Sequence, residues 1–183
     1  MQQIAQYQEA CITLAPDEAP DLYAIHERVM SLTNGNKGIT CAPIGRDGEG
    51  RMAVLFRAML GVSLPGGLPT ERKSIEEAMT FTVNAGVRLV KQTRYGERMP
   101  IVDEAMEKWH RVLADGGFST KNTQMVESAI AFYHRRLDQN TRLPFWAVSS
   151  DLTVMDAEKA AETMVRGVGR SRGLGFGMLM KAA

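Results

Sequence analysis

The glycines near the end of the chain constrain its fold more than any other feature. Two Gly-x-Gly pairs, separated by five residues, begin at Gly167 and Gly175 and include Gly169 and Gly177. Glycine adopts positive φ without steric cost and lets a main chain approach a ligand closely. Consecutive N–H groups in such a loop can form an anion-binding concavity. The pattern therefore predicts a tight loop that lies against a phosphate backbone.

The loop matches neither of two common nucleotide-binding motifs. It lacks the Gly-Lys-Ser/Thr of a Walker loop, and the residues after it predict a strand where a dinucleotide fingerprint needs a helix. The net charge of the chain is only +1, which argues against a protein that coats nucleic acid by bulk charge. Two local basic segments can still contact phosphate, and their cations are Arg88, Lys91, Arg94 and Arg98 in the first and Arg170 and Arg172 in the second.

The bulk properties narrow the class of protein. At 183 residues the chain could form one large domain or two small ones. No apolar run is long enough to span a bilayer, and the first ten residues do not resemble a signal peptide. We therefore expect a cytoplasmic protein that contacts no membrane. The two cysteines have no metal-ligand spacing, so we expect no metal and no other cofactor.

Hydrophobic periodicity and turn residues predict a mixed α+β chain. The first half reads as a strand (8–14), a helix capped by Asp21 (to 32), two strands (38–44 and 51–60), a Pro/Gly break and a polar stretch (70–77). The second half reads as a strand (79–84), the first basic segment (88–98), a helix (100–114), a hairpin (125–137 with 145–154), a helix capped by Asp156 (to 166), the glycine loop and a last strand (175–181). The stretch 125–137 fits a helix by period as well as a strand. This order suggests two tandem ferredoxin-like (RRM-like) βαββαβ domains, residues 1–77 and 78–183.

Tyr23 and His26 lie three residues apart in the predicted helix, so they share one face of it. Histidine can give or take a proton near neutrality, and a tyrosine hydroxyl can orient a neighbouring hydroxyl or phosphate oxygen. These groups suit cleavage of an RNA strand by its own 2′-hydroxyl, without a metal. The same spacing is also common at the border of a core, and spacing alone does not separate His26 from His110 and His134.

With its glycine loop and its Tyr23–His26 pair, the chain resembles the CRISPR repeat-processing endoribonucleases, specifically the CasE family of type I-E Cascade complexes. The segments that carry the resemblance are 21–26 with its Tyr-x-x-His, 81–85, 100–118 and 151–179 with its Gly-h-Gly-x5-Gly-h-Gly loop. The chain is somewhat short for the family between the first helix and residue 79. This leaves open a divergent form, such as one from a type IV or transposon-encoded CRISPR system.

The resemblance implies two tandem ferredoxin-like domains with RNA lying across a basic groove. It implies metal-independent cleavage within CRISPR repeats, in which Tyr23 orients the 2′-hydroxyl or stabilises the phosphate and His26 acts as general base or general acid. The glycine loop and the two basic segments would bind the RNA. The implied partners are the CRISPR repeat RNA hairpin, the mature guide RNA and other subunits of a Cascade-like effector complex.

Two other functions stay open from the sequence. One is a catalytically silent subunit of the same fold that binds a guide RNA, although a silent relative has less reason to carry both Tyr23 and His26. The other is a ferredoxin-like sensing or structural protein, against which the basic glycine loop counts.

Overall fold

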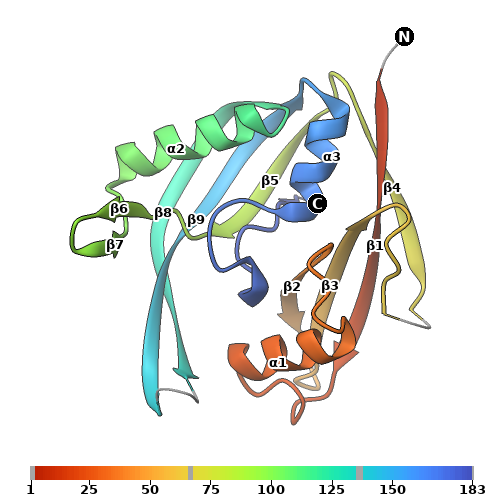
Figure 1. Ribbon diagram of the computed structural model, residues 1–183, viewed down its shortest axis with the longest axis vertical. Helices are drawn as coiled ribbons and strands as arrows, with labels where there is room; N and C mark the ends of the chain where they lie inside the picture. Colours follow the sequence, from red (N-terminus) through yellow and green to blue (C-terminus); the bar gives the residue numbers. More distant parts are fainter. Residues whose placement is uncertain (1–2, 66–67, 135–137, 183) are drawn as a thin grey trace.

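The computed structural model describes residues 3–65, 68–134 and 138–182. Its main framework is two four-stranded sheets, with strand orders β2-β3-β1-β4 and β10-β5-β9-β8. Every pairing between neighbouring strands in the two sheets is antiparallel. Figure 1 shows the two sheets with the glycine-rich segment between them. Both orders are those of a ferredoxin-like sheet, so the predicted fold class is confirmed.

The first unit holds β1 (Ile4–Leu14), α1 (Leu22–Leu32), β2 (Ile39–Arg46), β3 (Met52–Met59) and β4 (Thr70–Glu76). The strand β4 corrects our interpretation of residues 70–77 as a polar stretch. It lies at the edge of its sheet, and only Ile75 in it is buried, so its sequence lacks the alternation of a half-buried strand. The described part of the connection between β3 and β4 contains no helix.

The second unit holds β5 (Thr80–Val87), the two-stranded hairpin β6 (Lys91–Thr93) and β7 (Gly96–Arg98), α2 (Val102–Asp115), β8 (Phe118–His134), β9 (Gln139–Val154), α3 (Ala157–Arg166), a 3-10 turn (Arg172–Leu174) and β10 (Met180–Lys181). The predicted strand 175–181 is wrong over most of its length, because Gly175 and Gly177 turn the chain and only the last two residues pair with β5.

Local signals placed the starts of two helices correctly. The side chain of Asp21 accepts a hydrogen bond from the Ala24 amide at 2.8 Å, which caps α1. Asp156 caps α3 in the same way, accepting from the Lys159 amide at 3.0 Å. Both caps satisfy amides that have no partner within the helix.

The stretch that fitted both a helix and a strand is a strand. β8 and β9 are 17 and 16 residues long and pair along most of their length. In Figure 1 this hairpin runs from the second sheet down toward α1. Residues 135–137 of the predicted hairpin lie outside the described residues.

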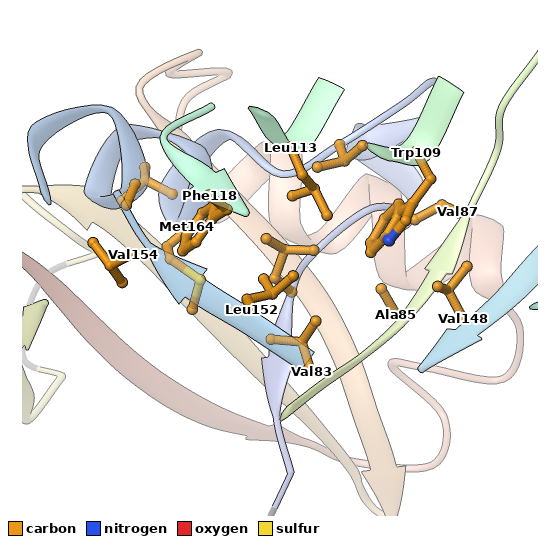
Figure 2. Close-up of a cluster of buried hydrophobic side chains, with 14 of the residues drawn as sticks. Val83, Ala85, Val87, Trp109, Leu113, Phe118, Val148, Leu152, Val154 and Met164 are labelled. Carbon is orange, nitrogen blue, oxygen red and sulfur yellow. The ribbon is translucent and has the colours of Figure 1, made fainter. Parts of the chain in front are cut away.

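Each sheet has a core, and the larger core joins the two units. On one face of the first sheet, Ile25 of α1 packs with Phe56 of β3. The second core gathers Val83 of β5, Trp109 of α2 and Met164 of α3, as Figure 2 shows. This same cluster includes Tyr7 of the first sheet. Since the units share a core, the boundary between residues 77 and 78 stays a prediction.

A buried arginine ties the first sheet to the second unit. Arg57 of β3 is 3% exposed and points away from α1, because the preceding residue on the strand packs toward that helix. Its Nε donates to Glu9 Oε1 at 2.6 Å. Its Nη1 donates to the carbonyl oxygens of Met164 at 3.3 Å and Leu179 at 2.7 Å. Met164 lies in the last turn of α3, where carbonyls lack helical partners, so Arg57 caps that helix from the other unit.

We predict that Arg57→Met lowers the free energy of unfolding by about 3–5 kcal/mol, because it removes the buried partner of the largely buried Glu9 carboxylate and leaves only Lys73, at 3.9 Å, beside it. Urea denaturation measures the change. The matched control is Arg51→Met, which removes an exposed arginine paired with Asp47 and Glu49 and should cost no more than about 1 kcal/mol. Equal costs for the two variants would show that Arg57 does not hold the units together.

Candidate functional site

Residues 167–177, which we call the glycine loop, turn tightly between α3 and β10. Its paired glycines all have positive φ, at +68° for Gly167, +87° for Gly169, +88° for Gly175 and +83° for Gly177. A Cβ on Gly177 would lie 1.8 Å from the carbonyl oxygen of Val168, and one on Gly169 would lie 2.7 Å from that of Arg88. The loop therefore needs these glycines to fold on itself and on β5. Contact between their backbone and RNA stays a prediction.

Main-chain hydrogen bonds attach the glycine loop to the end of β5. The Gly177 amide donates to the Gly86 carbonyl at 2.7 Å, and the Arg170 amide donates to the Arg88 carbonyl at 2.9 Å. Within the loop, the Val168 amide donates to the Gly177 carbonyl at 2.8 Å. The second sheet thus fixes where the loop lies.

The structure brings His26 to the glycine loop. The Nδ1 atom of His26 lies 2.6 Å from the carbonyl oxygen of Gly173. Because a carbonyl oxygen only accepts, Nδ1 carries the proton and donates, and Nε2 of the neutral ring is left as an acceptor. The contact joins motifs that stand 147 residues apart and fixes both the orientation and the tautomer of the ring.

Tyr23 belongs to an apolar cluster at the same junction. Leu22 of α1, Phe132 of β8 and Phe176 of the glycine loop form its buried part, and the partly buried Tyr23 and Leu174 pack against them. The long β8–β9 hairpin reaches α1 through this cluster (Figure 1). The elements that hold Tyr23 therefore come from both units.

Two concave surfaces flank the glycine loop. One has a volume of about 580 Å³ and lies between the loop, α1 and β2, with Arg172 and Gly173 in its wall. The other has a volume of about 610 Å³ and lies between β2 and strands of the second sheet, with Phe145 and Gly175 in its wall. A ligand could thus reach the loop from both sides, and on the 580 Å³ side it would lie next to Gly173, the residue that contacts His26.

The β6–β7 hairpin carries the first basic segment, and acids already neutralise part of it. Lys91 pairs with Glu104, and Arg98 pairs with the same carboxylate, Nη2 lying 3.2 Å from Oε2. The hydrogen bond from Lys91 is the largest cause of the lowered pKa of the Glu104 carboxyl. The guanidinium of Arg94 lies over the ring of the exposed Tyr95, 4.6 Å from its centroid.

The remaining predicted cations lie where this hairpin meets the glycine loop. Arg88 donates from Nη1 to the Ser171 hydroxyl at 2.7 Å. Arg170 pairs with Glu97 of β7, Nη2 lying 3.1 Å from Oε1. Arg172 donates to a carbonyl at the end of α3 at 3.2 Å. The structure thus brings the two basic segments together, and their contact with phosphate stays a prediction.

The other histidines lie elsewhere. His110 on α2 hydrogen-bonds Thr123 through Nε2 at 3.1 Å, and His134 is at the end of β8.

Over the part of the chain that the structure describes, no group of three or more His, Cys, Asp or Glu side chains could hold a metal ion. No helix in the same ranges is long and apolar enough to cross a bilayer.

Sequence reasoning missed the residues whose partners are far away in the chain. Arg57 is visible in the sequence only as a charge inside the apolar strand 52–59, and nothing nearby points to Glu9. No local signal shows that Glu97 and Glu104 pair with predicted RNA-binding cations. Lys108 also lacks a signal of its own, although it lines a pocket beside the glycine loop.

The fold and the site define a class of protein with two ferredoxin-like units and a glycine-rich loop at their junction. A family model described as CRISPR associated protein matches residues 69–182, and the chain belongs to this family. No curated protein matches the chain significantly by sequence.

Solved structures share the fold over nearly the whole chain. Thermus thermophilus Cse3, bound to an RNA representing a pre-cleavage complex, is 18% identical with a TM-score of 0.69, covering 98% of this chain and 100% of that one. A CRISPR endoribonuclease Cse3 bound to a 19-nucleotide RNA is 15% identical with a TM-score of 0.70 and the same coverage. A chain of a CRISPR RNA-guided surveillance complex, pre-nicking, is 10% identical with a TM-score of 0.62, covering 96% of this chain and 99% of that one.

We predict that Gly169→Ala lowers the free energy of unfolding by about 1–3 kcal/mol, because alanine is strained at positive φ. Its Cβ would also meet the Arg88 carbonyl. Gly48→Ala is the control, since that glycine has no positive φ and a Cβ added there would have no neighbouring atom within 4 Å. The control should stay within about 0.5 kcal/mol of wild type. Thermal or urea unfolding of both variants measures the difference, and a wild-type stability for Gly169→Ala would make the loop an ordinary turn.

Proposed function

We propose that this protein is an endoribonuclease that cleaves CRISPR precursor RNA within its repeats and stays bound to the repeat hairpin of the mature guide RNA. The observation that carries the proposal is the contact between His26 and Gly173, which places a proton-transfer group at a loop suited to phosphate. Membership of the CRISPR associated family and the fold shared with RNA-bound Cse3 support it.

The proposed reaction breaks the RNA strand by attack of a 2′-hydroxyl on the adjacent phosphorus. The bond from phosphorus to the 5′-oxygen of the next nucleotide breaks, leaving a 2′,3′-cyclic phosphate and a 5′-hydroxyl. The 2′-hydroxyl loses a proton, and the departing 5′-oxygen gains one, so the reaction needs a base and an acid but no metal.

His26 fits a proton-transfer role because Nδ1 is engaged as a hydrogen-bond donor to the Gly173 carbonyl, which leaves Nε2 for the RNA. The neutral ring then offers the Nε2 lone pair, which suits a general base for the 2′-hydroxyl. The protonated ring would donate from Nε2, which suits a general acid for the 5′-oxygen. In either role the carbonyl of Gly173 orients the ring, and Tyr23 lies on the same face of α1 to orient the 2′-hydroxyl or stabilise the phosphate.

The proposed RNA path crosses the junction of the two units. Arg170 and Arg172 of the glycine loop and the cations of the β6–β7 hairpin would contact phosphates along it. By analogy with the surveillance-complex chain of the same fold, other subunits of a Cascade-like effector complex are the proposed protein partners. A cytoplasmic location stays a prediction.

We predict that His26→Ala lowers single-turnover cleavage of a repeat RNA by about 10²- to 10⁴-fold, the usual contribution of a general acid–base residue. RNA affinity should change only a few-fold, and Tyr23→Phe should slow cleavage less. Activity should persist in EDTA. A gel-based assay with the repeat RNA measures cleavage and binding together.

The control variant is His110→Ala, which removes a histidine whose partner is Thr123 of β8 rather than the glycine loop. It should cut at the wild-type rate. Normal cleavage by His26→Ala would contradict the assignment, and tight binding without cleavage by the wild-type protein would identify a silent guide-RNA-binding subunit instead.

A further inference from the structure

A small basic pocket opens beside the start of the glycine loop, on the side that faces α2. Its volume is about 290 Å³. The connection between β5 and β6, the strand β6, α2 and the glycine loop contribute its lining residues, which are Arg88, Val90, Gln92, Lys108, Gly169 and Arg170. Three of these residues are cations and none is an acid, so the lining is selective for an anion.

Two cations of the pocket, Arg88 and Lys108, keep hydrogen-bond donors for which the described residues provide no acceptor. Arg88 Nε is buried and has no hydrogen-bond partner among the described residues, although Nη1 of the same side chain is bonded to Ser171. A buried donor without a partner is costly, so its presence points to an acceptor that binds there. Lys108 donates to the Val90 carbonyl at 2.6 Å, which leaves its other ammonium hydrogens available.

Within the ranges that the structure describes, only one carboxylate forms an ion pair with a cation of this pocket. Glu97 pairs with Arg170 at 3.1 Å, and both side chains are partly exposed, at 37% and 63%. No ion pair involves Arg88 or Lys108 in the same ranges. An exposed pair of this kind is weak, so an incoming phosphate can replace Glu97 on Arg170.

We infer that this pocket binds one phosphate of the RNA backbone, held by Arg88 Nε, by Lys108 and by Arg170 once Arg170 exchanges Glu97 for the phosphate. The inference rests on the proposed function, because it assigns the anion to RNA. Lys108 is thereby a phosphate-binding residue that the sequence did not reveal. Glu97 competes with the RNA for Arg170 in the free protein.

Because of its position, we expect the pocket to bind RNA and not to take part in cleavage. Gly169 and Arg170 line this pocket and also the 580 Å³ concave surface that includes Gly173, the partner of His26. A strand anchored in the pocket can therefore continue along the glycine loop toward His26. Loss of the anchor should weaken RNA affinity and leave the cleavage rate at saturating protein unchanged.

The first experiment measures the salt dependence of repeat-RNA affinity for Lys108→Gln. One lost phosphate contact should lower the slope of log K against log salt by about 0.7–0.9. The control, Arg111→Gln, removes a cation from the same helix outside this pocket and should leave the slope as in wild type. Equal slopes for the two variants would overturn the inference.

The second experiment uses Glu97→Gln, which removes the ion pair that holds Arg170 in the free protein. The expected result is a gain in RNA affinity, which a folding defect would not produce. RNA affinity should rise, and Glu107→Gln, which removes an exposed acid of α2 outside this pocket, should give a smaller rise. An affinity for Glu97→Gln at or below that of Glu107→Gln would contradict the exchange.

A titration with inorganic phosphate distinguishes the source of the anion. In ¹⁵N spectra the Arg88 Nε–H resonance should shift to saturation in wild type and not in Lys108→Gln. If phosphate shifts it while the RNA salt slope does not depend on Lys108, the pocket binds free phosphate and its assignment to RNA is overturned. If the slope depends on Lys108 while the wild-type protein binds the repeat RNA without cleaving it, the proposed endoribonuclease function fails and the phosphate pocket stands.

Discussion

The docking of the second unit on Arg57 is the contact on which the rest of the site depends. Arg57 is buried on the face of the first sheet opposite α1, and its guanidinium binds Glu9 and the carbonyl oxygens of Met164 and Leu179. Those carbonyls stand just before and just after the glycine loop. The first sheet therefore holds α1 on one face and both ends of the loop on the other, which sets where His26 and Gly173 meet.

The glycine loop shows how backbone conformation and chemistry are combined in one segment. Its positive-φ glycines let the chain pass close to β5, and the same tight path points the Gly173 carbonyl at His26. On the loop, Arg170 then pairs with Glu97 of the β6–β7 hairpin, and the Ser171 hydroxyl accepts a hydrogen bond from Arg88. A cluster of cations needs counter-charges, and Glu97 and Glu104 supply them through ion pairs with Arg170 and Lys91.

Local signals made much of the fold predictable. Asp21 and Asp156 cap helices through contacts only three residues long, and the order of strands and helices indicated the two ferredoxin-like units. The strand β4 was missed because an edge strand with one buried residue has no periodic pattern. Arg57 could not be placed, since its partners include groups 48 and 122 residues away. The pairing of Tyr23 and His26 was visible, but the contact of His26 with the loop depends on docking that no local pattern encodes.

The most direct test is the tautomer of His26, which the ¹⁵N chemical shifts of its ring report at alkaline pH. We predict a proton on Nδ1, donated to the Gly173 carbonyl, with Nε2 unprotonated. We also predict that Arg57→Met abolishes this tautomer preference in the fraction of the variant that stays folded. A wild-type ring protonated on Nε2 instead would contradict the claim that docking of the two units builds the site.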